Sequence, residues 1–248
     1  MLSLLDARQA VSQAWARYAS ILRSLSESDW ERRTRLPGWS VRDLVAHTVA
    51  GTSMEADALR RWRSGETEAA VWPQPDPAAG PHELLAAQLE SCAELSHQLT
   101  HVESGDRDRL VPMPYGALPV DLVLQIFTME AAVHAHDLAV ACGKRGALDD
   151  DAVRATVVVL EVFRPVFAAA ADETPTQPTT VALRSCDVDL RLRFDEGTWS
   201  SAPDATPTDV ITGDDSTLVL FALGRVPADA VGGSAAARQK FKAWFPGP

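Results

Sequence analysis

The feature that most restricts the fold of this chain is the apolar segment from Pro119 to Gly143, which carries ionisable side chains within a helical pattern. Glu130 and His134 stand one helical turn apart, and Asp137 follows on the same arc, where apolar residues also repeat. A buried carboxylate without hydrogen bonds or a counter-charge is costly, or it takes up a proton. The segment therefore predicts a core helix whose polar side chains have a partner, and a bound metal is the simplest partner.

The opposite arc of the same segment is polar. It carries Asp121, Gln125, Thr128 and His136, and this pattern predicts a face turned toward solvent. The prediction separates the two neighbouring histidines, with His134 as a candidate ligand and His136 outside the site.

His47 is the candidate for a third ligand. The segment from Ser40 to Arg63 predicts a helix, with Ser40 as the N-cap and Asp43 as its capping-box partner, and His47 lies on the apolar arc of that helix. Gly51, one turn further on, leaves room above such a site.

Two histidines and a glutamate on inward arcs match a three-ligand site with an open fourth position, as in catalytic zinc centres. Other interpretations stay open at this point. A single inward histidine is often a core residue bonded to a backbone carbonyl, and Glu130 with His134 could be a buried ion pair. The same ligand set also suits nickel, iron or manganese.

The remaining histidines predict a solvated surface. His97 and His101 have the spacing of a chelating pair, but both lie opposite the apolar stripe of the helix predicted over Pro81 to Glu103, which runs through Leu99. His82 lies near the start of that helix, and we expect it to be exposed as well.

The composition and charge of the chain exclude some classes of binding partner. The chain has 248 residues, of which 46% are hydrophobic, and a net charge of −11 without basic runs, which argues against nucleic acid and anionic membrane surfaces. It has no stretch long enough to span a membrane and three scattered cysteines without a disulfide or zinc pattern. The apolar run from Met1 to Leu5 is too short for a signal peptide. We expect a cytoplasmic protein with a small-molecule substrate.

The chain divides into a helical part and a part with strands. Amphipathic patterns predict helices at about 3–25, 40–63, 81–103, 119–143 and 149–171, with proline-bearing loops at 64–80 and 105–119. Period-two alternation then predicts strands within 181–184 and 187–195, with further strands at Trp199 and 209–212 and short helices at 216–223 and 234–244. This pattern predicts an α+β protein: an antiparallel four-helix bundle within residues 1–174, followed by a small α/β domain at 175–248.

Three motifs resemble the mycothiol-dependent maleylpyruvate isomerase family, which belongs to the DinB-like metalloenzymes. They are LPGWSVRDLVAH (Leu36 to His47), EAAVHAHDLAVA (Glu130 to Ala141) and LVLFALGR (Leu218 to Arg225). The resemblance spans nearly the whole chain. It implies a DinB-type four-helix bundle followed by a small α/β domain.

The resemblance also implies site residues and an activity. A divalent metal, commonly zinc, would be held by His47, Glu130 and His134, and Arg225 would reach from the small domain toward the carboxylates of the substrate. A surface arginine after a short helix is the other interpretation of Arg225. Asp137 matches an aspartate of the second motif without a ligand role. The implied enzyme uses mycothiol or a similar thiol as nucleophile on an electrophilic substrate, as an S-transferase or as a cis-trans isomerase.

Two alternatives belong to other classes. One is a non-catalytic binding or regulatory protein that keeps the bundle and the metal. The other is a metal-dependent hydrolase, for which Asp43 and Asp137 are the candidate general bases near His47.

Overall fold

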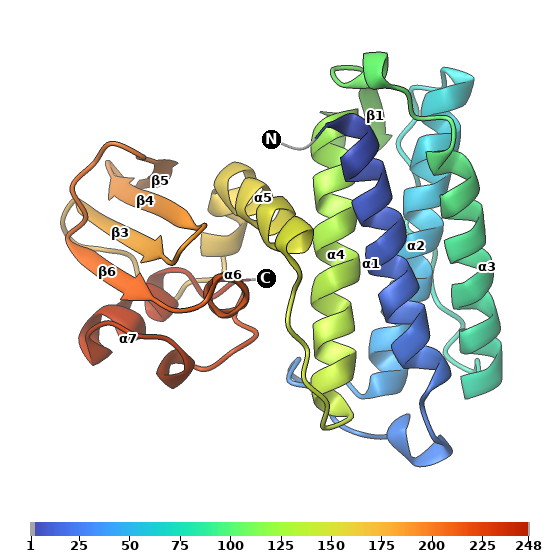
Figure 1. Cartoon of the computed structure of the whole chain (residues 1–248), viewed down its shortest axis with the longest axis horizontal. Coiled ribbons are helices and arrows are strands. Elements are labelled where there is room, and N and C mark those ends of the chain that lie inside the picture. The colour runs from blue at the N-terminus through green and yellow to red at the C-terminus, as the bar shows by residue number, and fades with distance from the viewer. Residues whose placement is uncertain (1–2, 248) are drawn as a thin grey trace. The chain divides into compact units, whose positions relative to one another are not determined.

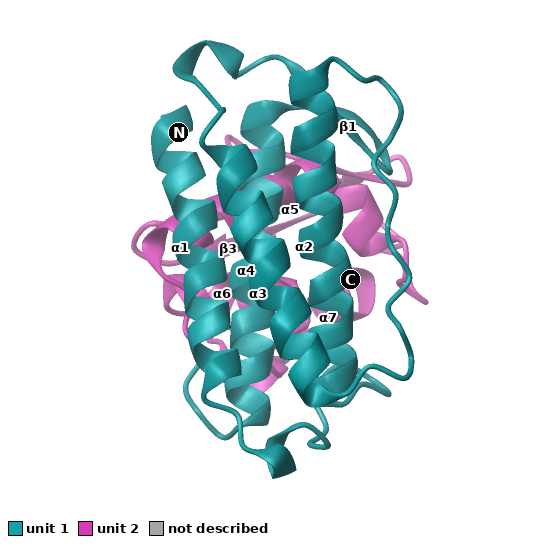
Figure 2. Cartoon of the chain, turned by 90° about the vertical axis from the view of Figure 1, so that its right-hand side faces the viewer, with its two compact units in different colours: residues 1–146 teal, residues 147–248 magenta. Residues whose placement is uncertain are grey.

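The structure is a computed structural model that describes residues 3–247. Its contacts group the chain into two compact units, Met1–Gly146 and Ala147–Pro248, which are coloured separately in Figure 2. Of the apolar run from Met1 to Leu5, the first two residues lie outside the described part. No helix within residues 3–247 has both the length and the apolar composition that crossing a lipid bilayer requires.

The first unit is a four-helix bundle (Figure 1). Its helices are α1 (Leu4–Arg23), α2 (Val41–Ser64), α3 (Pro81–Leu99) and α4 (Val120–Ala141), with 3-10 turns η1 (Glu27–Asp29) and η2 (Ser104–Asp106). Helix α1 packs on α4 and α3, and α2 packs on α3 and α4. The predicted bundle is confirmed, and the four helices begin and end within a few residues of the predicted limits.

Contacts at the helix ends give the directions of the helices. Arg42, at the start of α2, donates a hydrogen bond of 2.6 Å to the carbonyl of Ala79, just before α3, so α2 and α3 run parallel. Lys144, just after α4, donates to Ser24 at the end of α1, over 2.8 Å, so α1 and α4 also run parallel. The two pairs are antiparallel to each other (Figure 1). The connection 65–80 therefore returns along the length of the bundle before α3 begins.

Helix α4 is buried on every side, which corrects the prediction of a solvent-facing arc. Gln125, Thr128 and His136 are only 4%, 2% and 6% exposed. Two of them have hydrogen-bond partners close by: the Thr128 hydroxyl donates to the Leu124 carbonyl over 2.9 Å, and Nδ1 of His136 is hydrogen-bonded to the carbonyl of Gly146. Three of the four polar side chains on this arc are therefore part of the core, whereas Asp121, at the start of α4, is partly exposed.

The segment predicted as a loop before α4 contains a β-hairpin. Strands β1 (Leu110–Met113) and β2 (Gly116–Pro119) pair antiparallel, with Tyr115 in the turn. Strand β1 contacts α2 and α4. The carbonyl of Pro112 also accepts a hydrogen bond of 2.9 Å from the backbone N–H of Ala70, which attaches the connection 65–80 to the hairpin.

The second unit contains a four-stranded sheet with the order β5-β4-β3-β6. Its elements are α5 (Asp150–Ala168), β3 (Thr179–Arg184), β4 (Asp189–Asp195), β5 (Thr198–Ser201), β6 (Asp209–Thr212), α6 (Asp215–Ala222), η3 (Ala228–Ala230) and α7 (Ala235–Trp244). Strand β6 is parallel to β3, and the other pairs are antiparallel. In β4, Leu190, Leu192 and Phe194 are buried and alternate with more exposed polar residues, as the period-two pattern predicts.

Helix α5 belongs by its contacts to the second unit. It packs on α6 and β5, and Nε of Arg164 donates to the carbonyl of Trp199 over 3.0 Å. The division after Gly146 therefore falls earlier than the sequence-based boundary between residues 174 and 175. The predicted boundary lies between α5 and β3, inside the second unit.

Candidate metal centre

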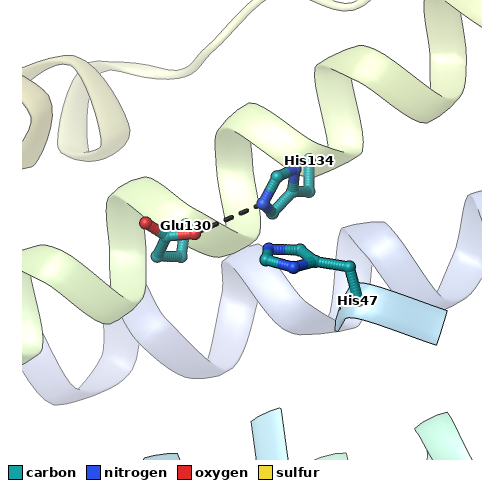
Figure 3. A group of neighbouring side chains, drawn as sticks. All are labelled: His47, Glu130 and His134. Atoms are coloured by element: carbon teal, nitrogen blue, oxygen red, sulfur yellow. Dashed lines mark ion pairs between the residues drawn. The ribbon is translucent and has the colours of Figure 1, made fainter. Parts of the chain in front are cut away.

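Helices α2 and α4 bring three predicted ligands together. Each of His47, Glu130 and His134 offers one ligand atom, and these atoms all lie within 4.8 Å of one another. The ring centroids of the two histidines are 5.0 Å apart, and Nε2 of His134 lies 3.3 Å from Oε2 of Glu130. Figure 3 shows the carboxylate of Glu130 and the two imidazole rings clustered between the helices.

The donor set fits a divalent transition metal. Ligand atoms at about 2.0–2.2 Å from a tetrahedral zinc ion lie about 3.4 Å from one another, so the observed spacing needs only small side-chain movements. Two imidazole nitrogens and one carboxylate oxygen also match the ligand types that zinc accepts in catalytic sites.

The start of α2 fixes the position of His47. Ser40 accepts a hydrogen bond from the backbone N–H of Asp43, and the Asp43 carboxylate accepts one of 2.8 Å from the backbone N–H of Ser40, which completes the predicted capping box. His47 then lies two turns inside the helix. Its ring contacts two indoles, with centroid distances of 5.0 Å to Trp39 and 5.4 Å to Trp72.

Asp137 contacts the other nitrogen of His134. Oδ2 of Asp137 lies 3.3 Å from Nδ1 of His134, and Asp137 is only 2% exposed. A proton on Nδ1 would be donated to this carboxylate, which leaves Nε2 as the atom that faces Glu130 and His47. Burial lowers the pKa of His134, but the hydrogen bonds with Asp137 and Glu130 outweigh this effect and raise the pKa to about 9.

A second buried acid, Glu55, lies beside the cluster, and the sequence interpretation missed it. Glu55 on α2 is 2% exposed, and its Oε2 accepts a hydrogen bond of 3.0 Å from the indole N–H of Trp15. Burial raises the pKa of Glu55 well above its usual range, and the nearby Glu130 carboxylate adds to this rise. Its position two turns after His47, among small and apolar residues, was the available signal.

A small pocket opens on these groups. It has a volume of about 60 Å³, which suits a few non-hydrogen atoms beside the ligand cluster. Besides His47, Glu55, Glu130 and His134, its lining includes apolar and aromatic side chains from α1, α2, α4, the hairpin turn and the connection 65–80: Trp15, Met54, Trp72, Tyr115, Ile126 and Phe127.

The space above Gly51 is partly filled. A β-carbon added to Gly51 would lie 3.4 Å from the indole of Trp72, so this side chain covers the glycine that the sequence suggested as room for a ligand. A β-carbon at this position would be in ordinary van der Waals contact with the indole, whereas a longer side chain would compete with the indole that packs against His47.

The other histidines and the acid Asp43 considered in the sequence lie outside the ligand cluster. His82, His97 and His101 are exposed, as predicted. Asp43 is exposed and serves the cap of α2, so it is not an inward general base.

Arg225 lies in the second unit, directly after α6. It is only 9% exposed, which excludes the surface interpretation, and its Nη1 donates to the carbonyl of Leu223 over 3.0 Å. Lys242 lies nearby and donates to the carbonyls of Phe221 and Ala222 at the end of the same helix, over 3.0 and 3.1 Å. Burial, together with the charge of Arg225, lowers the pKa of Lys242 to about 7.

The chain matches one protein family over more than half its length. The family model described as "Mycothiol maleylpyruvate isomerase N-terminal domain" matches residues 11–139. Two uncharacterized proteins of Mycobacterium tuberculosis, from strains CDC 1551 and H37Rv, are each 26% identical over 176 residues, which covers 69% of this chain and 89% of theirs.

Solved structures share the fold. The crystal structure of the mycothiol-dependent maleylpyruvate isomerase superposes with a TM-score of 0.67 at 18% identity, covering 94% of this chain and 93% of that chain. A histidine-to-alanine mutant of that enzyme gives a TM-score of 0.66 at 17% identity. The predicted combination of a helical bundle with a small α/β part is thereby confirmed.

We predict that Glu55→Gln stabilises the metal-free protein, and that the gain grows as the pH rises from about 5 to about 8. The unfolded chain loses the Glu55 proton above a pKa of 4.5, whereas the folded protein keeps it to higher pH, so the stability of the wild type falls as the pH rises above 4.5. The amide cannot ionise, and its oxygen can still accept the Trp15 hydrogen bond. Urea unfolding at several pH values measures the difference.

Glu90→Gln is the matched control, because Glu90 is exposed on α3 and should show no such trend. A gain for Glu55→Gln that stayed constant over the whole range would mean that Glu55 is ionised in the folded protein.

Proposed function

Because the chain belongs to the family of the mycothiol maleylpyruvate isomerase N-terminal domain, we propose that it is a metal-dependent enzyme that uses mycothiol or a similar thiol as its nucleophile. The proposed reaction is a cis-trans isomerisation like that of maleylpyruvate isomerase, or transfer of the thiol to an electrophile. The observation that carries the proposal is the convergence of His47, Glu130 and His134 at a small pocket.

His47, Glu130 and His134 would hold the metal, for which zinc is our first choice. When bound, a divalent ion at an open position lowers the pKa of a thiol, so that the nucleophilic thiolate dominates near neutral pH. The scattered cysteines of the chain, all of them free, are not needed for this chemistry.

The remaining residues would position the ligands and exclude water. Asp137 holds His134 with Nε2 facing the cluster, and Trp39 with Trp72 fixes the ring of His47. Apolar walls such as Met54 and Phe127 keep the pocket dry, which strengthens the interaction between the thiolate and nearby charges.

The isomerisation balances without an external reactant. The thiolate sulfur adds to one carbon of a conjugated double bond, and the electron pair moves onto the adjoining carbonyl. The former double bond rotates as a single bond, and the reverse step expels the thiolate. A transferase would instead add a proton to the adduct, or displace a leaving group, and keep the sulfur–carbon bond. We propose Arg225 as the catalytic cation that binds a carboxylate of the substrate.

The hydrolase alternative is less well supported. It needs an ionised general base near the bound water, but the inward carboxyl that lines the pocket besides Glu130 is Glu55, whose pKa is raised by burial. A non-catalytic protein that binds metal and thiol would keep the same cluster, and only turnover separates it from an enzyme.

We expect the purified wild type to contain about one divalent metal per chain, and His47→Ala and Glu130→Ala to lose it. Each variant leaves two ligands, which hold a metal far more weakly than three. Metal analysis by mass spectrometry identifies the ion and its amount, and titration with mycothiol should show binding to the loaded form only.

His97→Ala is the matched control, because His97 is exposed on α3 and should leave the metal content unchanged. Folded wild-type protein that takes up no metal would overturn the proposal.

Metal binding near pH 7 should release about one proton per chain, since His134 has a pKa of about 9 without metal and must lose its proton to become a ligand. Asp137→Asn removes the charge that favours the protonated ring but keeps an oxygen for the hydrogen bond, so the variant should bind metal and release fewer protons. Calorimetry in buffers with different heats of ionisation counts them.

Asp108→Asn, at an exposed position of the same unit, should behave like the wild type in this experiment. Equal proton release from Asp137→Asn and the wild type would contradict the assigned role of Asp137.

Arg225→Gln should raise KM for a dicarboxylate substrate by about tenfold or more, because a charge-assisted hydrogen bond is lost, while metal content and thiol affinity stay unchanged. Arg225→Lys should restore part of the loss. Steady-state kinetics measure the effect, and Lys240→Gln, at an exposed position of α7, is the control. An unchanged KM in a folded Arg225→Gln variant would remove Arg225 from the site.

A further inference from the structure

A second hollow adjoins the metal pocket within the first unit. This groove has a volume of about 540 Å³ and is lined by the start of α2, the segment before it and the connection 65–80. His47 and Trp72 line both the groove and the metal pocket, so the same two side chains border both spaces.

The two volumes suit different parts of one ligand. The pocket of about 60 Å³ has room for a sulfur atom and a few neighbouring atoms. A volume of about 540 Å³ lies in the usual range for binding sites of whole small molecules. A thiol whose sulfur reaches the ligand cluster must therefore extend outward, and the groove offers the adjoining space.

The lining of the groove indicates the chemistry of the ligand. Trp39 and Trp72 contribute aromatic rings, which pack well on the C–H faces of saturated rings, and Asp43, Gln74 and Asp76 contribute oxygens that accept hydrogen bonds from hydroxyl groups. Arg42 is the one arginine in this lining, which contains no lysine, against the two carboxylates of Asp43 and Asp76. This balance favours a neutral body rich in hydroxyl groups over an anionic one.

The groove is held in shape by contacts of its own. Nη2 of Arg42 donates to the carbonyls of Pro77 and Ala79 over 3.2 and 2.6 Å, and the backbone N–H of Ala70 donates to Pro112 of β1. The connection 65–80 is thus tied to α2 and to the hairpin, so a ligand would meet a site with little ordering left to do.

We propose that this groove binds the hydroxyl-bearing body of the thiol whose sulfur is directed to His47, Glu130 and His134. The inference rests on the proposed function and adds the recognition site for the part of the thiol that does not react. Mycothiol carries an acylated cysteine on two hydroxyl-bearing rings, whereas N-acetylcysteine has the cysteine end alone. A comparison of the two thiols therefore distinguishes binding in the groove from binding in the metal pocket.

The test is calorimetric titration of the zinc-loaded protein with both thiols. The wild type should bind mycothiol at least about tenfold more tightly than N-acetylcysteine. The double variant Gln74→Ala/Asp76→Asn should weaken mycothiol binding by about fivefold, since it alters two hydrogen-bonding groups, and leave N-acetylcysteine within about twofold of the wild type. Zinc content should not change.

A second variant tests the aromatic wall. Trp72→Leu keeps an apolar cover over His47 but removes the ring, and should weaken mycothiol binding by about tenfold. Asp108→Asn, exposed and outside the groove, is the control for the carboxylate change and should bind both thiols like the wild type.

The outcomes separate the two proposals. Equal affinity of the wild type for both thiols, or equal weakening of both by Gln74→Ala/Asp76→Asn, would overturn the groove assignment while the metal-bound thiol stands. If neither thiol binds to the zinc-loaded wild type, the proposed function fails, and the groove assignment falls with it.

Discussion

The burial of ionisable groups between α2 and α4 is the constraint on which the rest of this structure depends. Glu130 and Asp137 flank His134 along one helix, and Glu55 lies across from them on α2. Three carboxyl groups in so small a volume cannot all keep their charge without compensation. In the metal-free protein His134 holds a proton and Glu55 stays neutral, as their raised pKa values indicate. A single bound divalent cation would also neutralise the charge of these carboxylates.

The positions of these groups follow from how the helices begin and what covers them. The capping box of Ser40 and Asp43 sets the start of α2, and thereby the turn on which His47 lies. The connection 65–80 then brings Trp72 over Gly51 and against His47. A side chain longer than that of alanine at position 51 would compete with the indole for this space, so the small residue helps to keep the indole against His47.

Helical periodicity predicted the bundle and the ligand cluster because a fixed period places His47, Glu130 and His134 on inward arcs whatever the details of packing. It could not predict that α4 is covered on all sides, so His136 was assigned to solvent although it is buried and bonded to Gly146. Glu55 was not predicted as a site residue because it lies at the edge of the apolar arc of α2. The hairpin of β1 and β2 was predicted as a loop because it contains Pro112 and Pro119. A two-stranded ribbon nevertheless tolerates prolines at its open edges.

The charge around the pocket decides when a thiol could act there. Among the described residues that line it, two are glutamates and none is a lysine or an arginine. Without a metal, the protonated His134 is already paired with Glu130 and Asp137. A thiolate in this lining would therefore lack a counter-charge of its own in an apolar environment, which raises the pKa of a thiol. The groove beside it offers Arg42, but two hydrogen bonds to backbone carbonyls already hold that side chain. The lining therefore suppresses thiolate formation in the empty protein, so reactivity of a bound thiol would depend on the same ion that holds His47, Glu130 and His134 together.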